Sequence, residues 1–322
     1  TGVAVVFRTD SRSICARWTT TDRQLSTHMT GLSQKGMDLY IKRDGEWVFA
    51  GVARPGMGAE HKATIVDHMD GAEKECLLYL PLFSELESLE IGTEQGSTLE
   101  PMENPFRRRI AYFGSSFTHG SGTSRAGMAY PSQLERSTGL YFINLGVSGN
   151  SKLQPVFADI LCRTDAEAFV LDGFSNPQAE EVEARLFPFI DRIRAVRPDV
   201  PIVFVRTVHR EGCNFDLVKQ AHFEDRIARA ARMARLATEQ RRLFSGYSRS
   251  HGHGSCHFDR RNAPFRSGIL ALGRTAARPV IGDSRPLRDR VVPPLLRVPE
   301  KKRVAICSPF LFSRPASFPF SS

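Results

Sequence analysis

The sequence lacks any apolar run near the roughly 18 residues that a membrane-spanning helix needs. Its first eight residues, which begin without Met, also lack the basic and then apolar order of a signal peptide. From these absences and a 41% apolar composition we expect a soluble globular protein. A chain of 322 residues has the length of about two domains, each with its own core.

Cysteine is also scarce, and no two of the six cysteines form a Cys-x-x-Cys pair. Cys256 lies near other ligand types, between His251 and His257 in His-Gly-His-Gly-Ser-Cys-His. No helix or strand is predicted there that could fix the tetrahedral geometry of a structural zinc site. We therefore expect no metal and no other cofactor, and the cysteines do not indicate a redox compartment.

Acidic residues are scarce at one end only. Residues 241–322 carry 16 Lys and Arg against 4 Asp and Glu, whereas residues 1–240 are slightly acidic. An Arg-rich tail can bind nucleic acid or an anionic surface. Its Arg residues follow neither helical nor strand periodicity, however, which favours a disordered basic tail rich in Pro and Arg. We expect no nucleic-acid partner.

Residues 1–95 show the two-residue alternation of β-strands and little helical pattern. Apolar side chains recur at every second position from Cys76 to Leu82, and Asp44-Gly45 has the composition of a hairpin turn between two strands. Many short strands joined by turns predict a β-sandwich.

A polar linker at 96–107 precedes a change of pattern. Residues 108–240 alternate between apolar strands and amphipathic helices, which predicts a parallel sheet covered on both faces. The predicted strands are 109–114, 141–147, 167–173 and 201–208, and the predicted helices are about 128–138, 151–162, 178–196 and 216–240. From about Phe244 the alternation stops, and residues 241–322 hold 9 of the 19 prolines. This pattern predicts a parallel sheet that is incomplete at four strands.

Three residues suited to acyl transfer follow three successive predicted strands. Ser116 follows the first strand, Gly146 the second and Asn176 the third. Because the carboxyl ends of parallel strands meet at one crevice, we expect the three residues to be neighbours. Ser116 would be the nucleophile, and the N–H groups of Ser116 and Gly146 with the Asn176 amide would stabilise an oxyanion.

Each of these residues also has a purely structural explanation. Ser116 could cap the helix that follows it, Gly146 could be required for a positive φ, and Asn176 before Pro177 could be a helix N-cap. Taken singly, the structural explanations are favoured. Their joint occurrence at three strand ends favours the catalytic interpretation.

The segments around these residues resemble the SGNH (GDSL-type) hydrolases. The resemblance is carried by Gly114-Ser115-Ser116-Phe117-Thr118, by 144–150 and by the Asn176 segment. Residues 125–131 and Gly36-Met37-Asp38-Leu39-Tyr40 are similar to the subfamily with an N-terminal Gly-x-Asp-Leu-Tyr domain. The resemblance implies a flavodoxin-like three-layer α/β/α SGNH hydrolase domain preceded by a β-sandwich, with Ser116 as nucleophile and Gly146 and Asn176 in the oxyanion hole. Relatives mostly hydrolyse carboxylic esters and often deacetylate carbohydrates.

The sequence departs from this family at the catalytic base. The family places its base in a late Asp-x-x-His motif, and no such motif follows residue 210. The candidate bases are His209, at the end of the fourth predicted strand, and His257, which lies near Asp259. His119 is expected on the surface of the turn, and Asp172 is expected to be structural.

A frameshift would explain both the missing motif and the basic tail. Read one nucleotide downstream with permitted codons, residues 257–264 can yield Gly-Gly-Thr-His-Pro, which is close to the family's late block. We therefore hypothesise that a frameshift near residue 240 replaced the last strand, the last helix and the catalytic histidine. Sequencing the coding DNA tests this hypothesis, because a continuous frame in several independent reads would rule it out.

The predicted function is that of a serine esterase that hydrolyses a small, acetyl-like ester. In many relatives such an acetyl group is attached to a carbohydrate. The alternative is a protein that binds an ester or carbohydrate without hydrolysing it, because the base is missing. Trp18, Tyr40 and Trp47 could stack on a sugar, although the sequence favours a place for them in the core. The compartment and the oligomeric state stay open, and relatives are often exported.

Overall fold

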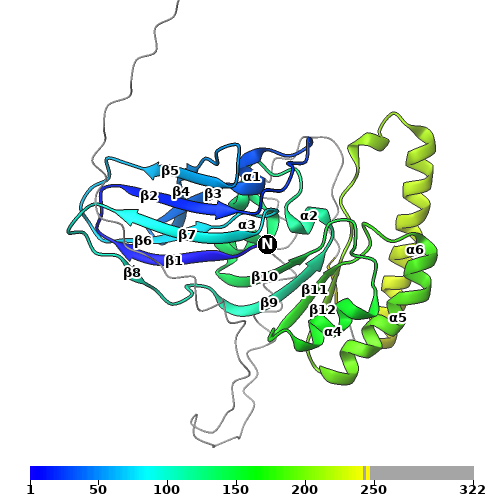
Figure 1. Ribbon diagram of the computed structural model, residues 1–322. Helices are drawn as coiled ribbons and strands as arrows, with labels where there is room; N and C mark the ends of the chain where they lie inside the picture. The colour runs from blue at the N-terminus through cyan, green and yellow to red at the C-terminus, as the bar shows by residue number, and fades with distance from the viewer. Residues whose placement is uncertain (242–243, 247–322) are drawn as a thin grey trace, which may run out of the picture. The chain divides into compact units, whose positions relative to one another are not determined.

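The computed structural model describes residues 1–241 and 244–246 (Figure 1). Within these ranges the chain forms two compact units, one of residues 4–104 and one of residues 1–3 together with the residues from 105 onward. The first unit consists of antiparallel strands and the second of a parallel sheet with helices, which confirms the predicted fold class. Apart from residues 241 and 244–246, the predicted basic tail lies outside the described residues. In the described part of the chain, no helix is both long and apolar enough to cross a membrane.

Two antiparallel sheets make up the N-terminal unit. The larger sheet has the order β4-β3-β6-β1-β8 and the smaller one β5-β2-β7. The elements are β1 (Ala4–Thr9), β2 (Ile14–Thr20), α1 (Gly31–Lys35), β3 (Met37–Arg43), β4 (Glu46–Ala53), β5 (Glu60–Val66), β6 (Lys74–Tyr79), β7 (Leu86–Thr93) and β8 (Glu100–Pro101). Leu39 of the larger sheet and Trp18 of the smaller sheet belong to one buried cluster, so the two sheets form the predicted sandwich.

Two details of this unit bear out the sequence analysis. Asp44 and Gly45, which join β3 to β4, have φ values of 52° and 81°, as a tight hairpin turn with two left-handed residues requires. Trp18 is fully buried, with its Nε1–H donating to the Lys35 carbonyl at 2.9 Å, and Tyr40 is buried as well. Trp47 is half-buried, and the Lys42 ammonium lies 5.8 Å from the centroid of its ring. Two of the three aromatic residues are therefore core residues.

The parallel sheet of the second unit has the order β10-β9-β11-β12-β13. Its strands are β9 (Arg107–Gly114), β10 (Leu140–Gly146), β11 (Ala168–Asp172), β12 (Ile202–Val205) and β13 (Phe244–Gly246). The first strand in the sequence therefore pairs with the second on one side and the third on the other, which is the flavodoxin-like doubly wound order. This topology places the topological switch point, and the crevice expected there, next to the end of β9.

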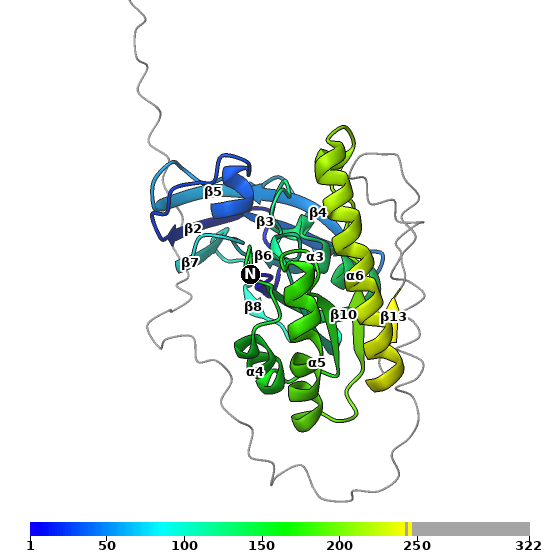
Figure 2. The ribbon, with the colours of Figure 1, turned by 90° about the vertical axis from the view of Figure 1, so that its right-hand side faces the viewer.

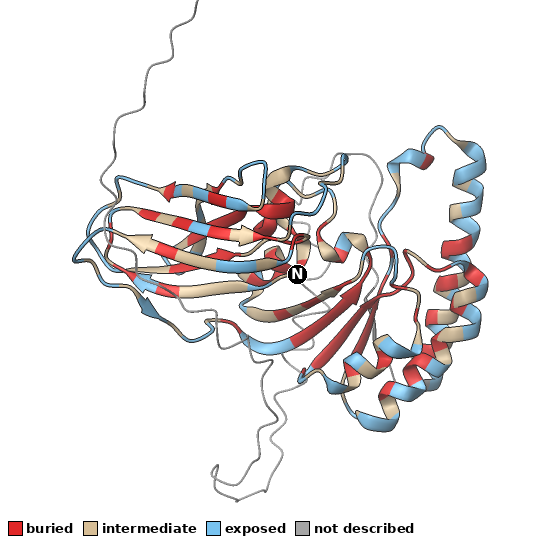
Figure 3. Cartoon of the chain, in the orientation of Figure 1, coloured by how far each residue is buried: buried red, intermediate tan, exposed pale blue. Residues whose placement is uncertain are grey.

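Helices cover both faces of this sheet. They are α2 (Ser116–His119), η1 (Ala126–Met128), α3 (Tyr130–Thr138), α4 (Pro155–Arg163), α5 (Ala179–Val196), η2 (Glu211–Cys213) and α6 (Leu217–Arg241). Ala111 and Phe113 of β9 belong to the cluster that includes side chains of α4, α5 and α6, whereas Ile110 and Tyr112 face the cluster that includes α3. Figure 2 shows α5 and α6 along one face, and Figure 3 shows the buried strands between the layers. The three-layer α/β/α arrangement was predicted.

The structure differs from the predicted strands at two places. A fifth parallel strand, β13, pairs with β12, although the alternation was expected to stop at about Phe244. It has only three residues, too few to produce a recognisable period. The fourth strand ends at Val205 rather than at residue 208, so His209 lies in the following loop and not at a strand end. Thr207 has left the ladder, and its hydroxyl donates to Ser175 Oγ at 2.9 Å.

Candidate active site

Ser116 is the first residue of α2, two residues after β9 ends at Gly114. The turn can be this tight because Gly114 has no side chain: a Cβ there would lie 1.9 Å from Thr118 Oγ1. Ser115 is the N-cap, and its Oγ accepts a hydrogen bond from the Phe117 N–H at 3.3 Å. The suggestion that Ser116 caps the helix is therefore wrong. Ser116 is half-exposed, and no side chain of the described residues hydrogen-bonds its hydroxyl.

The three strand ends lie in register. Gly114 pairs with Gly146 on β10 and with Asp172 on β11. A Cβ on Gly146 would lie 2.1 Å from the backbone nitrogen of His119, so the glycine is required by the close approach of α2. Gly146 does not have a positive φ, which makes that alternative explanation wrong. Thr118 and His119 of α2 are thus seated over two strand ends that have no side chains.

Asn144 connects β10 to α2. Its buried side chain accepts a hydrogen bond from the Gly146 N–H at 2.9 Å and donates one to the Thr118 carbonyl at 2.8 Å. Sequence reasoning missed this role, although a polar residue within an apolar strand was a visible signal. In this structure the Gly146 N–H is hydrogen-bonded to Asn144. The use of this N–H as an oxyanion donor stays a prediction, and it requires the N–H to turn toward the substrate. The Ser116 N–H is at the first position of a helix, where no carbonyl four residues earlier accepts it.

Asn176 is oriented by its carbonyl group. Its Oδ1 accepts the Ser151 N–H at 3.3 Å, which leaves the Nδ2 hydrogens to donate elsewhere. The N-cap of α5 is Gln178, which forms a capping box with Glu181, so the alternative role of Asn176 as N-cap is wrong. Asn176 therefore has the donor that its predicted role needs.

Asp172 lies beneath α2 in a buried polar cluster. Its Oδ2 accepts from Thr118 Oγ1 at 3.0 Å and from the Tyr130 hydroxyl at 3.3 Å, and these two hydroxyls are 2.5 Å apart. Burial raises the pKa of Asp172 to about 7, although the hydrogen bonds of Thr118, Tyr130 and Ser115 favour the charged form. Through Thr118 this carboxyl group holds the helix that carries Ser116, which agrees with the structural role expected for it.

None of the histidines that the structure describes is hydrogen-bonded to Ser116. His209 is exposed, and its Nε2 lies 2.7 Å from Asn214 Oδ1 in the same loop. The Nδ1 of His119 lies 3.4 Å from Ser148 Oγ. His257, the other candidate base, lies outside the described residues. So does the segment expected to be out of frame, except for residue 241 and β13, whose parallel pairing with β12 shows that a strand is present after residue 240. The identity of the base therefore stays a prediction.

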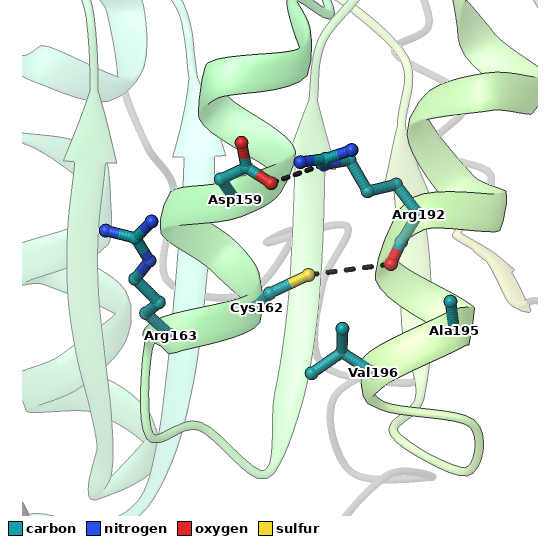
Figure 4. A pocket seen from close by; sticks show the side chains of 6 residues that line it. All are labelled: Asp159, Cys162, Arg163, Arg192, Ala195 and Val196. Atoms are coloured by element: carbon teal, nitrogen blue, oxygen red, sulfur yellow. Dashed lines mark hydrogen bonds and ion pairs between the residues drawn. The ribbon is translucent and has the colours of Figure 1, made fainter.

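A surface hollow between α4 and α5 contains none of the predicted site residues (Figure 4). The last turns of these helices lead into β11 and β12, so the hollow lies at the amino edge of the sheet, opposite the edge that carries Ser116. It is lined by Asp159, Cys162, Arg163, Arg192, Ala195 and Val196. Arg192 is paired with Asp159, and the Cys162 thiol lies 3.6 Å from the Arg192 carbonyl oxygen. Nothing in it resembles an acyl-transfer site.

Comparison with protein families and solved structures places the chain in a known group. Residues 1–99 match the GxDLY domain, the N-terminus of SGNH-hydrolase-type esterases, and residues 107–245 match the GDSL-like lipase/acylhydrolase family. A search of curated proteins found no match. The two matched ranges contain the sequence segments on which the resemblance to this family rests.

Two solved structures illustrate the likeness. A structure described as a GDSL-like lipase from Bacteroides ovatus is 42% identical, with a TM-score of 0.74 over 76% of this chain and 73% of that one. The salicylyl-acyltransferase of a tetracycline biosynthetic pathway is 20% identical, with a TM-score of 0.61 over 86% and 84% of the two chains.

A family two carbohydrate esterase from Cellvibrio japonicus is 12% identical, with a TM-score of 0.51 over 79% of this chain and 82% of that one. At this identity the likeness concerns the fold alone, as it does for the salicylyl-acyltransferase. The Bacteroides ovatus structure, at 42% identity, and the two domain matches show the family as well as the fold. On these grounds the chain belongs to the GDSL-like lipase/acylhydrolase family, whose members are typically carboxylic-ester hydrolases, and it carries the GxDLY domain of SGNH-type esterases at its N-terminal end.

Proposed function

We propose that this chain is a serine esterase that hydrolyses a small, acetyl-like ester through Ser116. The observation that carries the proposal is the half-exposed hydroxyl of Ser116, just after the end of β9. No side chain of the described residues hydrogen-bonds this hydroxyl. Family membership supports it. An acetylated carbohydrate is the substrate class that we propose, on the resemblance to relatives that deacetylate carbohydrates.

The proposed reaction begins with attack of Ser116 Oγ on the acyl carbonyl carbon, while a histidine takes the hydroxyl proton. The N–H groups of Ser116 and Gly146 and the Nδ2 of Asn176 stabilise the resulting oxyanion. Collapse of this intermediate breaks the bond to the alcohol, which leaves with the proton. Water then attacks the acyl-serine, releasing the carboxylic acid and regenerating Ser116. His209 and His257 remain the proposed bases.

A comparison of two serine variants tests the proposal. Ser116→Ala should lower the rate of p-nitrophenyl acetate hydrolysis by about 10³-fold or more, because the nucleophile is lost. Ser137→Ala changes an exposed serine of α3 and should keep the wild-type rate. Longer acyl chains and acetylated oligosaccharides, assayed by acid release, then define the substrate. Equal background rates in all three proteins would reject the enzyme.

The second candidate is a protein that binds the ester or carbohydrate without hydrolysing it. The absence of an Asp-x-x-His motif after residue 210 favours it. In that case wild type and Ser116→Ala should bind an acetylated oligosaccharide with equal affinity in calorimetry, with no acetate released. Acetate release that depends on Ser116 would exclude this candidate.

A further inference from the structure

Two arginines share one aromatic ring at the start of α6. The guanidinium carbons of Arg226 and Arg210 lie 5.4 Å and 5.6 Å from the centroid of the Phe223 ring. Arg226 and Phe223 belong to α6, whereas Arg210 lies in the loop that follows β12. The two positive charges on one ring repel each other, and a negative charge nearby would offset this repulsion.

That negative charge is not supplied by the residues that the structure describes. Arg226 is only 7% exposed, yet within 1–241 and 244–246 it has no ion pair and no hydrogen bond to an acidic group. The Nε atoms of Arg226 and Arg210 are both buried without a hydrogen-bond partner there. Burial, followed by the charge of Arg210, lowers the pKa of Arg226. A buried, unpaired guanidinium is costly, and such a group is ordinarily matched by an anion.

Arg229, three residues along the same helix, shows the ordinary arrangement. Its Nη2 lies 2.6 Å from Glu183 Oε2, and its Nη1 lies 2.5 Å from Glu180 Oε1. Arg229 is more exposed than Arg226 and has three acidic partners, Glu180, Glu183 and Asp225, whereas Arg226 has none among the described residues. On the same helix, the more buried of these two arginines is thus the one without an acidic partner among the described residues.

The pair lies at the edge of the sheet that carries the predicted active site. Nη2 of Arg210 donates to the Ser175 carbonyl at 2.7 Å. Ser175 immediately precedes Asn176, the predicted side-chain donor of the oxyanion hole, and its Oγ accepts from Thr207 beyond the end of β12. Arg210 is therefore attached to the loop that presents Asn176, and Arg226 is joined to Arg210 through the Phe223 ring.

We propose that Arg210 and Arg226 form an anion-binding subsite that accepts a carboxylate or phosphate group of the substrate. The planar guanidinium group matches both kinds of oxyanion, because it presents its N–H donors in a fixed fork. The anion site itself stands on the burial and pairing of the two arginines. Its assignment to the substrate rests on the proposed esterase function.

The anion site can be tested without any enzyme assay. At constant pH and ionic strength, inorganic phosphate should raise the thermal unfolding temperature of the full chain in a saturable manner, since it binds only the folded state. Arg226→Gln and Arg210→Gln should lose this shift. Arg235→Gln, which changes an exposed arginine of the same helix, should keep it. An equal shift in all four proteins, or no shift in the wild type, would overturn the site.

A second measurement separates an anion site from a purely structural arginine. Without phosphate, Arg226→Met should unfold at the same urea concentration as the wild type or at a higher one, because an uncompensated buried charge is removed. With phosphate, the order should reverse. If Arg226→Met unfolds at lower urea with and without phosphate by the same margin, the side chain is structural and the proposal fails.

Matched substrates test the assignment to the ester. Phenyl acetate and 4-acetoxybenzoate differ in a carboxylate on the leaving group, and the wild type should favour the charged ester mainly through a lower KM. Arg226→Gln should lose this preference about 10-fold or more, whereas Arg235→Gln should keep both the preference and the rate on phenyl acetate. Unchanged preference would overturn the substrate role. If neither ester is hydrolysed, the proposed function fails, and the phosphate titration still decides the anion site.

Discussion

The side chains that hold α2 are buried or half-buried and bonded to one another. Most of those that follow β12 are exposed, and the buried Arg226 has no acidic partner among the described residues. The first group, the α2 cluster, comprises Thr118, Tyr130, Asn144 and Asp172. The second group, the β12 segment, comprises residues 206–218 together with Arg226. It includes Phe215, Leu217 and Val218, which are 98%, 75% and 82% exposed. The α2 cluster is thus held by hydrogen bonds within the chain, whereas the β12 segment presents exposed apolar side chains and an arginine without an acidic partner among the described residues.

The largest effect is expected where α2 touches the sheet. Gly146→Ala should lower the free energy of unfolding by about 3 kcal/mol, because the new Cβ would meet backbone atoms of α2 that cannot rotate away. It should also abolish hydrolysis by displacing Ser116. Urea denaturation and the acetate ester assay measure both effects.

The matched control lies in the β12 segment. A Cβ on Gly212 in η2 would meet no atom within 4 Å, so Gly212→Ala should change stability by no more than about 0.5 kcal/mol. Comparable losses in the two variants would remove the contrast between the α2 cluster and the β12 segment.

A smaller loss is expected when a side chain of the α2 cluster is truncated. Asn144→Ala leaves the Gly146 N–H and the Thr118 carbonyl without their partner, at a cost of about 2 kcal/mol. His209→Ala, which removes the exposed contact with Asn214, should cost less than about 0.5 kcal/mol. Chemical denaturation of both variants gives the comparison, and an Asn144→Ala protein as stable as His209→Ala would contradict it.

The pH dependence of stability isolates Asp172. Its carboxyl group has an ordinary pKa of 3.8 and a folded-state pKa of about 7. Between these values the folded protein keeps a proton that the unfolded chain has lost, so stability falls as pH rises, by at most about 1.4 kcal/mol per pH unit. Below pH 3.8 and above pH 7 this contribution is flat.

Asp172→Asn supplies an uncharged side chain of nearly the same shape, so this part of the slope should vanish. Urea midpoints of both proteins at pH 4.5, 5.5, 6.5 and 7.5 give the difference. Other titrating groups contribute equally to both and cancel. Parallel pH profiles for wild type and variant would show that Asp172 is ionised in the folded protein.

Much of this architecture follows from local patterns in the sequence. Alternation of apolar strands and amphipathic helices predicted β9 to β12 and the helices between them, because each is long enough to show its period. β13 was missed because three residues carry no period. The predicted fourth strand was too long because Thr207 and Val208 continue its β-branched pattern. In the structure, the Thr207 hydroxyl instead donates to Ser175.

The site was predictable where it depends on strand ends and not where it depends on side-chain partners. Ser116, Gly146 and Asn176 could be named because parallel topology brings strand ends together. The engagement of the Gly146 N–H by Asn144 depends on a rotamer that no spacing reveals. Arg226 did carry a signal, since it shares a helical stripe with the buried Ala230 and Ala234, but a charged residue on such a stripe is easily taken for an exposed one.

The smallest expected effect tests whether the β12 segment is open in solution. Phe215 is 98% exposed, so Phe215→Ser gives up almost no burial and should change the free energy of unfolding by less than about 0.5 kcal/mol. Phe113→Ser, at a 1% exposed position of β9, is the opposite case and should cost several kcal/mol, as large core substitutions do. Urea denaturation of the two variants measures both changes. If Phe215→Ser were as costly as a core substitution, this phenylalanine would be packed against protein in solution. The β12 segment would then be as well packed as the α2 cluster, and the contrast between them would be lost.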